Sequence, residues 1–189
     1  MSIKVLVFSG SWRQGSVNQK LASVAAKELA ALGVEVTSIS LKDYPLPLID
    51  ANGFAQQPAE AKALRQVIDA HDALFIASPE YNAGYTPALK NALDWASVSP
   101  AGAPATGLAG KVIALGAASP GALGGYRGLT QMRTVLELGF GATLTPAMVT
   151  VGGGDAGFKE DGSIADERTA GFLKATLQQL VTMASKLKA

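Results

Sequence analysis

The chain has 189 residues, a length at which one compact domain over residues 1–189 with a substantial core is expected. Its net charge of +1 gives no basic surface for nucleic acid, and the absence of cysteine excludes a disulfide framework and thiol catalysis. The first residues, MSIKVLVFSG, lack the features of a signal peptide, and no apolar run reaches the length that spans a bilayer. We therefore expect a cytoplasmic protein that binds neither membranes nor nucleic acid.

Short apolar runs alternate with amphipathic segments along the chain. The run from Ile3 to Phe8 is nearly continuous, as in a strand covered on both faces. The next segment begins at Ser16, carries apolar residues on one helical face and stops at Gly33. The same alternation continues to the C-terminus. The sequence predicts strands at 3–8, 34–39, 72–78, 111–117 and 142–146, and helices at 16–32, 59–70, 86–97, 125–138 and from 166 onward.

Five strands that alternate with helices predict a doubly wound α/β fold, with a parallel sheet and helices on both of its faces. In such sheets, ligands bind beyond the carboxyl ends of the strands. Three loops follow predicted strands in this way and have the most unusual composition of the chain. We call them the first loop (residues 9–16), the second loop (78–86) and the third loop (117–125), and we expect the functional site there.

The first loop does not match the common nucleotide-binding motifs. It contains no G-x-G-x-x-G, which excludes the dinucleotide fingerprint. Gly10 and Gly15 have the spacing of a P-loop, but Ser16 and Val17 stand where that motif needs Lys and Ser or Thr. Without this lysine and this hydroxyl there is no charge for the outer phosphates and no Mg²⁺ ligand, so a triphosphatase is not expected.

The first loop and the start of its helix instead suit a single phosphate group. Three hydroxyls, an amide and a guanidinium surround a helix N-terminus, and such a set can enclose one dianion without a metal. An alternative remains, because Ser16 and Gln19 form the helix-capping pattern S-x-x-Q. The residues of the anion set are Ser9, Ser11, Arg13, Ser16 and Asn18.

The second and third loops favour a planar ligand beside this phosphate. In PEYN, Pro79 sets a turn, Glu80 and Asn82 are polar, and Tyr81 offers a stacking surface. The third loop has four glycines within 121–128, which let a backbone approach a ligand closely. Each loop also has an interpretation that needs no ligand: the second loop as a turn with an exposed Tyr, and the third loop as a flexible strand-to-helix connection.

Together the three loops resemble the NAD(P)H-dependent FMN reductase family, which includes bacterial quinone, chromate and azo-dye reductases. The matching segments are GSWRQGSVNQKLA, PEYNAGYTPALKNALDWAS and SPGALGGYRGLTQMR, which occur in the family's order. The resemblance implies a flavodoxin-like fold, a five-stranded parallel sheet of order 2-1-3-4-5, and tightly bound FMN. Two departures lie near the flavin, namely Trp12, where a smaller aliphatic residue is more usual, and the run 83–85.

The resemblance also implies a site for each part of FMN. Around the phosphate it places Ser11, Arg13, Ser16, Val17 and Asn18. Along the isoalloxazine it places Pro79, Glu80, Tyr81 and Asn82, and on the other side Ser119, Gly121, Gly124 and Gly125.

The activity that the resemblance implies is two-electron transfer from NADPH or NADH, through flavin N5, to a small quinone-like acceptor, with chromate or azo compounds as further acceptors. The cycle is ping-pong, and it needs no catalytic side chain because the flavin carries the chemistry. Tyr81 and Tyr85 would border the substrate. The chain would form a homodimer or homotetramer, as relatives do.

The remaining polar residues do not add a second chemistry. His71 is interpreted as a helix C-terminal residue rather than a base, and Trp95 as a core or interface residue rather than a stacking group. No metal site is expected, since DAGFKEDGS lacks the spacing of a calcium loop. Two other functions stay open: an FMN-binding electron carrier without NAD(P)H turnover, and a regulatory module with an empty flavodoxin-like fold. The even charge balance disfavours the carrier, and the polar loops disfavour the module.

Overall fold

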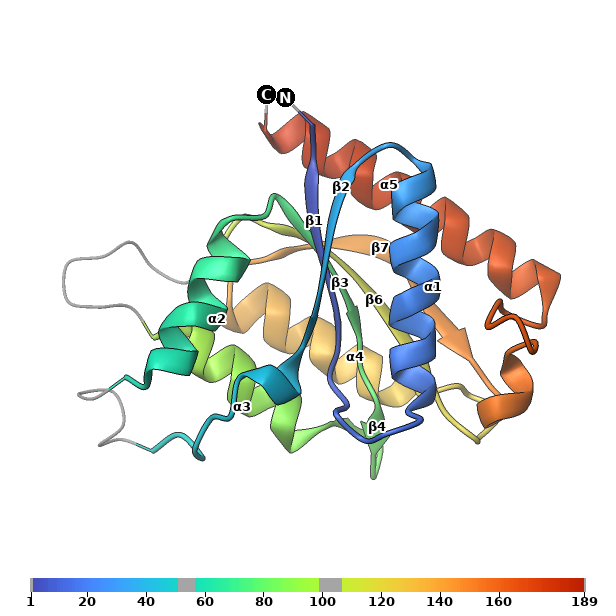
Figure 1. Ribbon diagram of the computed structural model, residues 1–189, viewed down its shortest axis with the longest axis horizontal. Coiled ribbons are helices and arrows are strands. Elements are labelled where there is room, and N and C mark those ends of the chain that lie inside the picture. Colours follow the sequence, from blue (N-terminus) through green and yellow to red (C-terminus); the bar gives the residue numbers. More distant parts are fainter. Residues whose placement is uncertain (1, 51–56, 99–106, 189) are drawn as a thin grey trace.

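The computed structural model describes residues 2–50, 57–98 and 107–188. Its centre is a five-stranded parallel sheet of order β2-β1-β3-β6-β7 (Figure 1). Counted among these strands alone, the order is 2-1-3-4-5, which confirms the predicted flavodoxin-like fold. The five strands are β1 (Lys4–Ser9), β2 (Glu35–Ser40), β3 (Ala73–Ala77), β6 (Val112–Ala118) and β7 (Thr143–Val151).

Helices cover both faces of this sheet. The described residues form five α-helices, and none of these is both long and apolar enough to cross a membrane. They are α1 (Val17–Ala31), α2 (Ala59–Asp69), α3 (Pro87–Ser97), α4 (Tyr126–Thr134) and α5 (Glu167–Lys188). Shorter turns are η1 (Leu41–Asp43), η3 (Val135–Gly139) and η4 (Gly154–Gly157).

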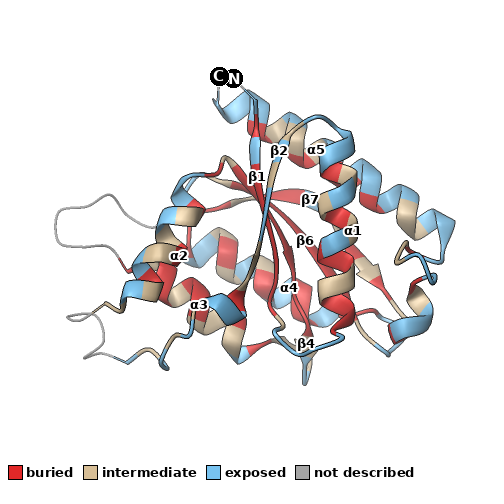
Figure 2. Cartoon of the chain, in the orientation of Figure 1, coloured by how far each residue is buried: buried red, intermediate tan, exposed pale blue. Residues whose placement is uncertain are grey.

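Alternation along the strands divides the core into two layers. Successive side chains of a strand point to opposite faces. In β1, Val5 and Val7 therefore pack with α1 and α5, whereas Leu6 and Phe8 pack with α2, α3 and α4. The three inner strands β1, β3 and β6 are buried almost throughout, whereas the edge strands β2 and β7 are only partly buried (Figure 2). This two-sided burial explains the nearly continuous apolar runs in the sequence.

The first helix begins and ends as its sequence predicts. The Ser16 hydroxyl caps it by accepting a hydrogen bond of 3.3 Å from the backbone N–H of Asn18. Leu21, Ala25 and Leu29 are buried at spacings of four residues, which turns one face to the sheet. Gly33 follows the helix with φ +76°, a conformation that glycine adopts without strain. The helix therefore holds its N-terminus at the carboxyl end of β1.

Two elements differ from the sequence prediction. The last strand was expected at 142–146, but β7 continues to Val151. Its register against β6 shifts between Ile113 and Leu115, where Leu144 and Met148 are the partners, so the strand bulges around Pro146. Proline is tolerated at a bulge in an edge strand. The helix predicted at 125–138 starts at Tyr126 and changes to a π turn, η3, for its last residues.

An antiparallel hairpin that the sequence did not predict extends from the second loop. Its strands are β4 (Glu80–Tyr81) and β5 (Gly84–Tyr85). Asn82 and Ala83 connect them with φ of +50° and +64°, as a type I′ turn requires. Asn accepts this conformation more readily than Ala does, so Ala83 is under local strain.

Candidate functional site

The structure brings the three loops together at the carboxyl edge of the sheet. The Gly10 amide donates to the Ala77 carbonyl at 2.9 Å, and the Thr86 hydroxyl donates to the Gly10 carbonyl at 3.0 Å. These two bonds join the first loop to the second. Asn18 joins the first loop to the third, because its side chain reaches Ala118 at the end of β6.

The first loop is a folded cradle in front of α1. The Ser9 hydroxyl accepts from the Ser11 amide at 3.1 Å, and Gly15 turns the chain with φ +70°. The Ser16 hydroxyl caps the helix by accepting from the Asn18 backbone N–H. Gln19 does not complete the capping pattern, because its side-chain Nε2 donates to the Ser11 carbonyl at 3.0 Å. The cap takes the Asn18 N–H, and the Gln19 and Lys20 N–H groups donate to the Ser16 carbonyl, so the Val17 N–H at the first position of α1 is the helix donor left for this cradle. Capping and anion binding are thus compatible.

Asn18 belongs to the frame of the site, by which we mean the polar side chains that bind the protein itself and hold the loops in place. Its Nδ2 donates to the Ala118 carbonyl at 2.8 Å, and its Oδ1 accepts from the Ala118 amide at 2.9 Å. Both residues are buried, so the pair satisfies two backbone groups that water cannot reach. The Asn18 side chain is therefore occupied within the protein and its backbone N–H is taken by the Ser16 cap, whereas the buried Val17 could contact an anion through its backbone N–H. Arg13 in contrast is exposed, with one long hydrogen bond of 3.4 Å to the Gln14 carbonyl.

Glu80 holds the second loop against α4. Its carboxylate accepts from Arg127 Nε and from the Gly128 amide, each at 3.0 Å, and the side chain is only 9% exposed. Burial by itself would raise the pKa of Glu80, but the hydrogen bonds from Gly128 and Arg127 and the charge of Arg127 outweigh it, so this pKa lies below its usual value. The carboxylate is thus bound to the protein itself, and it sets the position of the second loop relative to the third.

Two glycines of the third loop are required by the fold. Gly124 has φ +59°, and a Cβ there would lie 2.8 Å from the Val151 nitrogen. Gly125 has φ +94°, and its Cβ would lie 2.7 Å from that of Ala117. Gly121 differs, since the nearest atom to its Cβ position is the Ser119 hydroxyl at 3.8 Å. Gly121 therefore leaves room beside the backbone for another molecule.

A pocket of about 450 Å³ opens between the first loop, the second loop and the segment that follows η1. Tyr81 lines it and is 60% exposed, whereas Tyr85 packs against the core, so the two tyrosines expected at the substrate are separated. Leu46 and Leu48 also line the pocket and were not predicted from the sequence. The sequence feature that could have identified these two leucines is the apolar pattern PLPL within a proline-rich loop. The described residues of the lining are Gly10, Ser11, Trp12, Arg13, Leu46, Leu48, Tyr81, Thr86, Pro87, Ala88 and Asn91.

Comparison with known proteins assigns a family to this arrangement. The family model described as NADPH-dependent FMN reductase matches residues 3–156, which include all three loops. The chain belongs to the NADPH-dependent FMN reductase family. It is thus an oxidoreductase of the NAD(P)H-dependent FMN reductase type, and the predicted enzyme class and the cofactors FMN and NAD(P)H are confirmed.

Individual relatives agree with this family over nearly the whole chain. An NAD(P)H-dependent FMN reductase of Pseudomonas aeruginosa is 33% identical over 98% of this chain and 97% of its own. An NAD(P)H:quinone oxidoreductase of Solanum tuberosum is 34% identical over 98% of this chain and 95% of its own. Among solved structures, the flavoenzyme NAD(P)H:(acceptor) oxidoreductase FerB of Paracoccus denitrificans is 31% identical, with a TM-score of 0.81 over 97% of this chain and 98% of its own.

The donor set of this FMN reductase fits its cofactor. A phosphate monoester needs several donors and positive charge, which the cradle supplies through the helix N-terminus, Ser11 and Arg13. A flat ring system needs close backbone approach, which the third loop permits beside Gly121. The frame bonds of Asn18 and Glu80 keep these two parts at a fixed separation.

The interpretations of His71 and Trp95 are confirmed. His71 follows α2, and its Nδ1 lies 2.6 Å from the Val67 carbonyl, to which it donates. Trp95 is 1% exposed, and its Nε1 donates to the Pro47 carbonyl at 2.7 Å. Within the ranges 2–50, 57–98 and 107–188, no group of three or more His, Asp or Glu could hold a metal ion.

Proposed function

We propose that this FMN reductase passes two electrons from NAD(P)H to quinones. The balanced reaction is NAD(P)H plus H⁺ plus quinone, giving NAD(P)⁺ and hydroquinone. The observation that carries the proposal is the junction of one anion cradle with an apolar, aromatic pocket at the same sheet edge. Relatives named quinone reductase support it, among them one of Escherichia coli that is 35% identical over 71% of this chain and 69% of its own.

The proposed FMN site follows from the loops. The cradle holds the phosphate, with Arg13 as its counter-charge and the hydroxyls and N–H groups of the α1 start as its donors. The PEYN turn and the third loop hold the ring from two sides. The phosphate set is Ser11, Arg13, Ser16, Val17 and Asn18, and the ring set is Pro79, Glu80, Tyr81, Asn82, Ser119, Gly121, Gly124 and Gly125.

The residues of the three loops would hold FMN, which would supply the two-electron chemistry between NAD(P)H and the acceptor. The protein binds and orients the reactants, and it contributes no nucleophile. Tyr81 is open to water at the pocket mouth, so solvent protons can reach an acceptor bound beside it. The pocket has the volume of a site for one small molecule. Donor and acceptor therefore use it in turn, which gives ping-pong kinetics.

The proposal extends to further acceptors and to assembly. Flat azo compounds suit the pocket as quinones do, whereas chromate, a compact anion, should be the weaker acceptor, and turnover with each of them tests this order. Trp12, Leu48 and Tyr81 expose apolar surface at the pocket mouth, and such surface is often covered by a neighbouring chain. We expect a homodimer or homotetramer, which sedimentation measurements would distinguish from a monomer.

An anaerobic titration of the purified protein with NADPH, followed at the flavin absorbance, tests the function. We expect bleaching in proportion to added NADPH and full recovery on addition of a quinone. A bound flavin that neither NADPH nor NADH bleaches would contradict the reductase and indicate the electron carrier. Protein without flavin, even after reconstitution with FMN, would contradict the cofactor site itself.

A further inference from the structure

We propose that the pocket between Trp12 and Tyr81 is the acceptor site, and that Trp12 makes it selective for flat, uncharged aromatic acceptors over compact ionic ones. The inference rests on the proposed quinone reductase function and specifies its substrate class. It starts from one residue of this chain, Trp12, whose side chain is 50% exposed on a cofactor loop. A large apolar side chain exposed beside a pocket needs a ligand or a partner to cover it.

The pocket has aromatic and aliphatic walls. Trp12 of the first loop and Tyr81 of the hairpin line it from two elements, and Leu46 and Leu48 line it from the segment after η1. Aromatic side chains in the lining of a pocket offer stacking surfaces to a flat molecule. The pocket volume of about 450 Å³ lies in the usual range for small-molecule sites.

The segment that carries the two leucines is fixed rather than loose. Asn91 of α3 accepts from the Ile49 amide and donates to the Pro47 carbonyl, each at 2.9 Å. Trp95 donates to the same carbonyl at 2.7 Å, and Leu46 and Ile49 pack beside it. The leucine wall is therefore held at a set distance from the first loop, so the width of the pocket is defined before a ligand enters.

The polar groups of the lining are mostly used within the protein. The Thr86 hydroxyl donates to the Gly10 carbonyl, and the Asn91 amide holds the 46–49 segment. Among the described residues of the lining, Arg13 is the one charged residue, and the FMN phosphate would neutralise it. The pocket thus offers little to a compact anion or a cation, and its surface suits an uncharged ring system.

The experiment compares Trp12→Leu with wild-type holoenzyme in the NADPH assay. The acceptors are 2-methyl-1,4-naphthoquinone, which is flat and uncharged, and ferricyanide, a compact anion that takes the same two electrons in two equivalents. The loss of aromatic contact should raise KM for the naphthoquinone by about 3- to 10-fold. We expect kcat with this quinone, and both constants for ferricyanide, to stay within about twofold.

Three further variants separate stacking from other effects. Trp12→Phe keeps a ring and should restore most of the naphthoquinone affinity. Leu48→Ser alters the opposite wall without touching the first loop, and it should show a smaller loss with the same selectivity. Phe172→Leu, at a side chain of matched exposure (47%) on α5, should change neither acceptor. FMN content is measured first in each variant, so that a lost cofactor is not mistaken for a lost acceptor.

Binding without turnover gives an independent readout. Oxidised holoenzyme cannot reduce the naphthoquinone when no NAD(P)H is present, so quenching of tryptophan fluorescence reports binding alone. We expect saturable quenching in wild type and its loss in Trp12→Leu, in which the buried Trp95 remains. Equal KM changes for both acceptors, or none for either, would overturn the inference while leaving a working quinone reductase. Wild-type protein that reduces no quinone would contradict the proposed function instead.

Discussion

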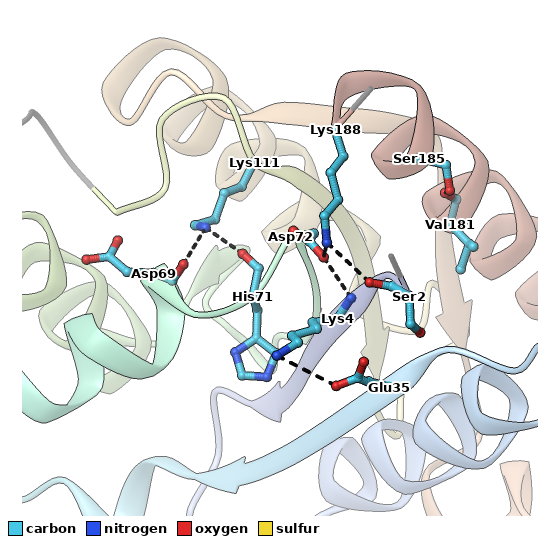
Figure 3. A network of polar contacts seen from close by, with 10 residues as sticks. All are labelled: Ser2, Lys4, Glu35, Asp69, His71, Asp72, Lys111, Val181, Ser185 and Lys188. Carbon is cyan, nitrogen blue, oxygen red and sulfur yellow. Dashed lines mark hydrogen bonds and ion pairs between the residues drawn. The ribbon is translucent and has the colours of Figure 1, made fainter.

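The two ends of the central sheet use polar side chains in opposite ways. At the carboxyl end, Arg13 and the start of α1 carry the donors that we propose for the FMN phosphate. At the amino end, charged groups bind one another and the backbone. Asp72, just before β3, accepts from the Lys4 amide and from Lys188 Nζ, each at 2.8 Å (Figure 3).

The amino end is connected across elements far apart in the sequence. Lys188 at the end of α5 also donates to the Ser2 carbonyl at 3.2 Å (Figure 3). Lys111, before β6, donates to the carbonyls of Asp69, the last residue of α2, and of His71, which follows the helix. Burial lowers the pKa of Lys111, only partly offset by the charges of Asp69 and Asp72. At the amino end the polar groups bind one another and so stabilise the fold. At the carboxyl end Asn18 and Glu80 bind the protein in the same way, and Arg13 and the start of α1 are the donors proposed for the ligand.

The largest effect is expected from Asn18→Ala, which breaks the frame. It leaves the buried N–H and C=O of Ala118 without their partner, at a cost of about 2–5 kcal/mol in the free energy of unfolding. FMN affinity should fall with it, because the cradle loses its connection to β6. Urea unfolding and FMN titration measure the two effects. The control is Asn91→Ala, which releases the 46–49 segment and should leave FMN affinity nearly unchanged. An equal loss of FMN affinity in both variants would contradict the role of Asn18 in holding the cradle to β6.

Arg13→Ala should affect cofactor binding without affecting the fold. Loss of a charged donor to the phosphate should raise the FMN dissociation constant about 10- to 100-fold. The flavin-free protein should unfold within about 0.5 kcal/mol of wild type, because Arg13 is exposed. Arg168→Ala, at another exposed arginine, is the matched control. An unchanged FMN affinity in Arg13→Ala would show that the phosphate lies elsewhere.

Glu80→Gln should weaken the connection between the second loop and α4. It removes the charge that binds Arg127, so we expect a loss of about 1 kcal/mol in stability and a several-fold loss of FMN affinity. Because the folded pKa of Glu80 is lowered, its contribution is complete above the unfolded pKa and is lost as pH falls through the folded pKa. Fluorescence titration with FMN measures the change. In Glu137→Gln, which alters an ion pair within one helical stretch, FMN affinity should not move.

Asp72→Asn tests the amino end, and its effect should be the smallest. Burial by itself would raise the pKa of Asp72, but hydrogen bonds from Lys188 and the Lys4 amide, and the charges of Lys188 and Lys111, hold it below its usual value. Its stabilising effect is thus present above the unfolded pKa of about 3.9 and is lost on acidification through the folded pKa.

At pH 7, Asp72→Asn should lower stability by about 0.5–1 kcal/mol, and the difference from wild type should disappear in strong acid. Thermal unfolding between pH 7 and pH 2 measures it, with Asp94→Asn, from the Lys90 ion pair, as a surface control. FMN affinity should be unchanged at pH 7. A loss of FMN there would mean that the two ends of the sheet are not independent.

Much of the fold was predictable because apolar runs and helix signals agree along this chain. The exceptions are local. Pro146 looked like the end of the last strand, but an edge strand can bulge around it. The hairpin was missed because Ala83 occupies a position where glycine is the usual signal.

The composition of the candidate site was predictable, but the direction of its side chains was not. Asn18 lies 100 positions from Ala118, the partner that occupies its amide, and Glu80 lies 48 from Gly128. Sequence spacing cannot show whether a polar group in a loop faces a ligand or another loop. Leu46 was missed for the same reason, since its neighbours come from the first loop and α3.

The meeting of Ser2 and Lys188 also determines how this protein can be attached to other materials. Ser2 and Lys188 lie side by side at the amino end of the sheet (Figure 1). A linker joined to either end would leave the carboxyl edge facing outward. On an electrode or a bead, molecules held in this way would share one orientation, with the three loops accessible from solution.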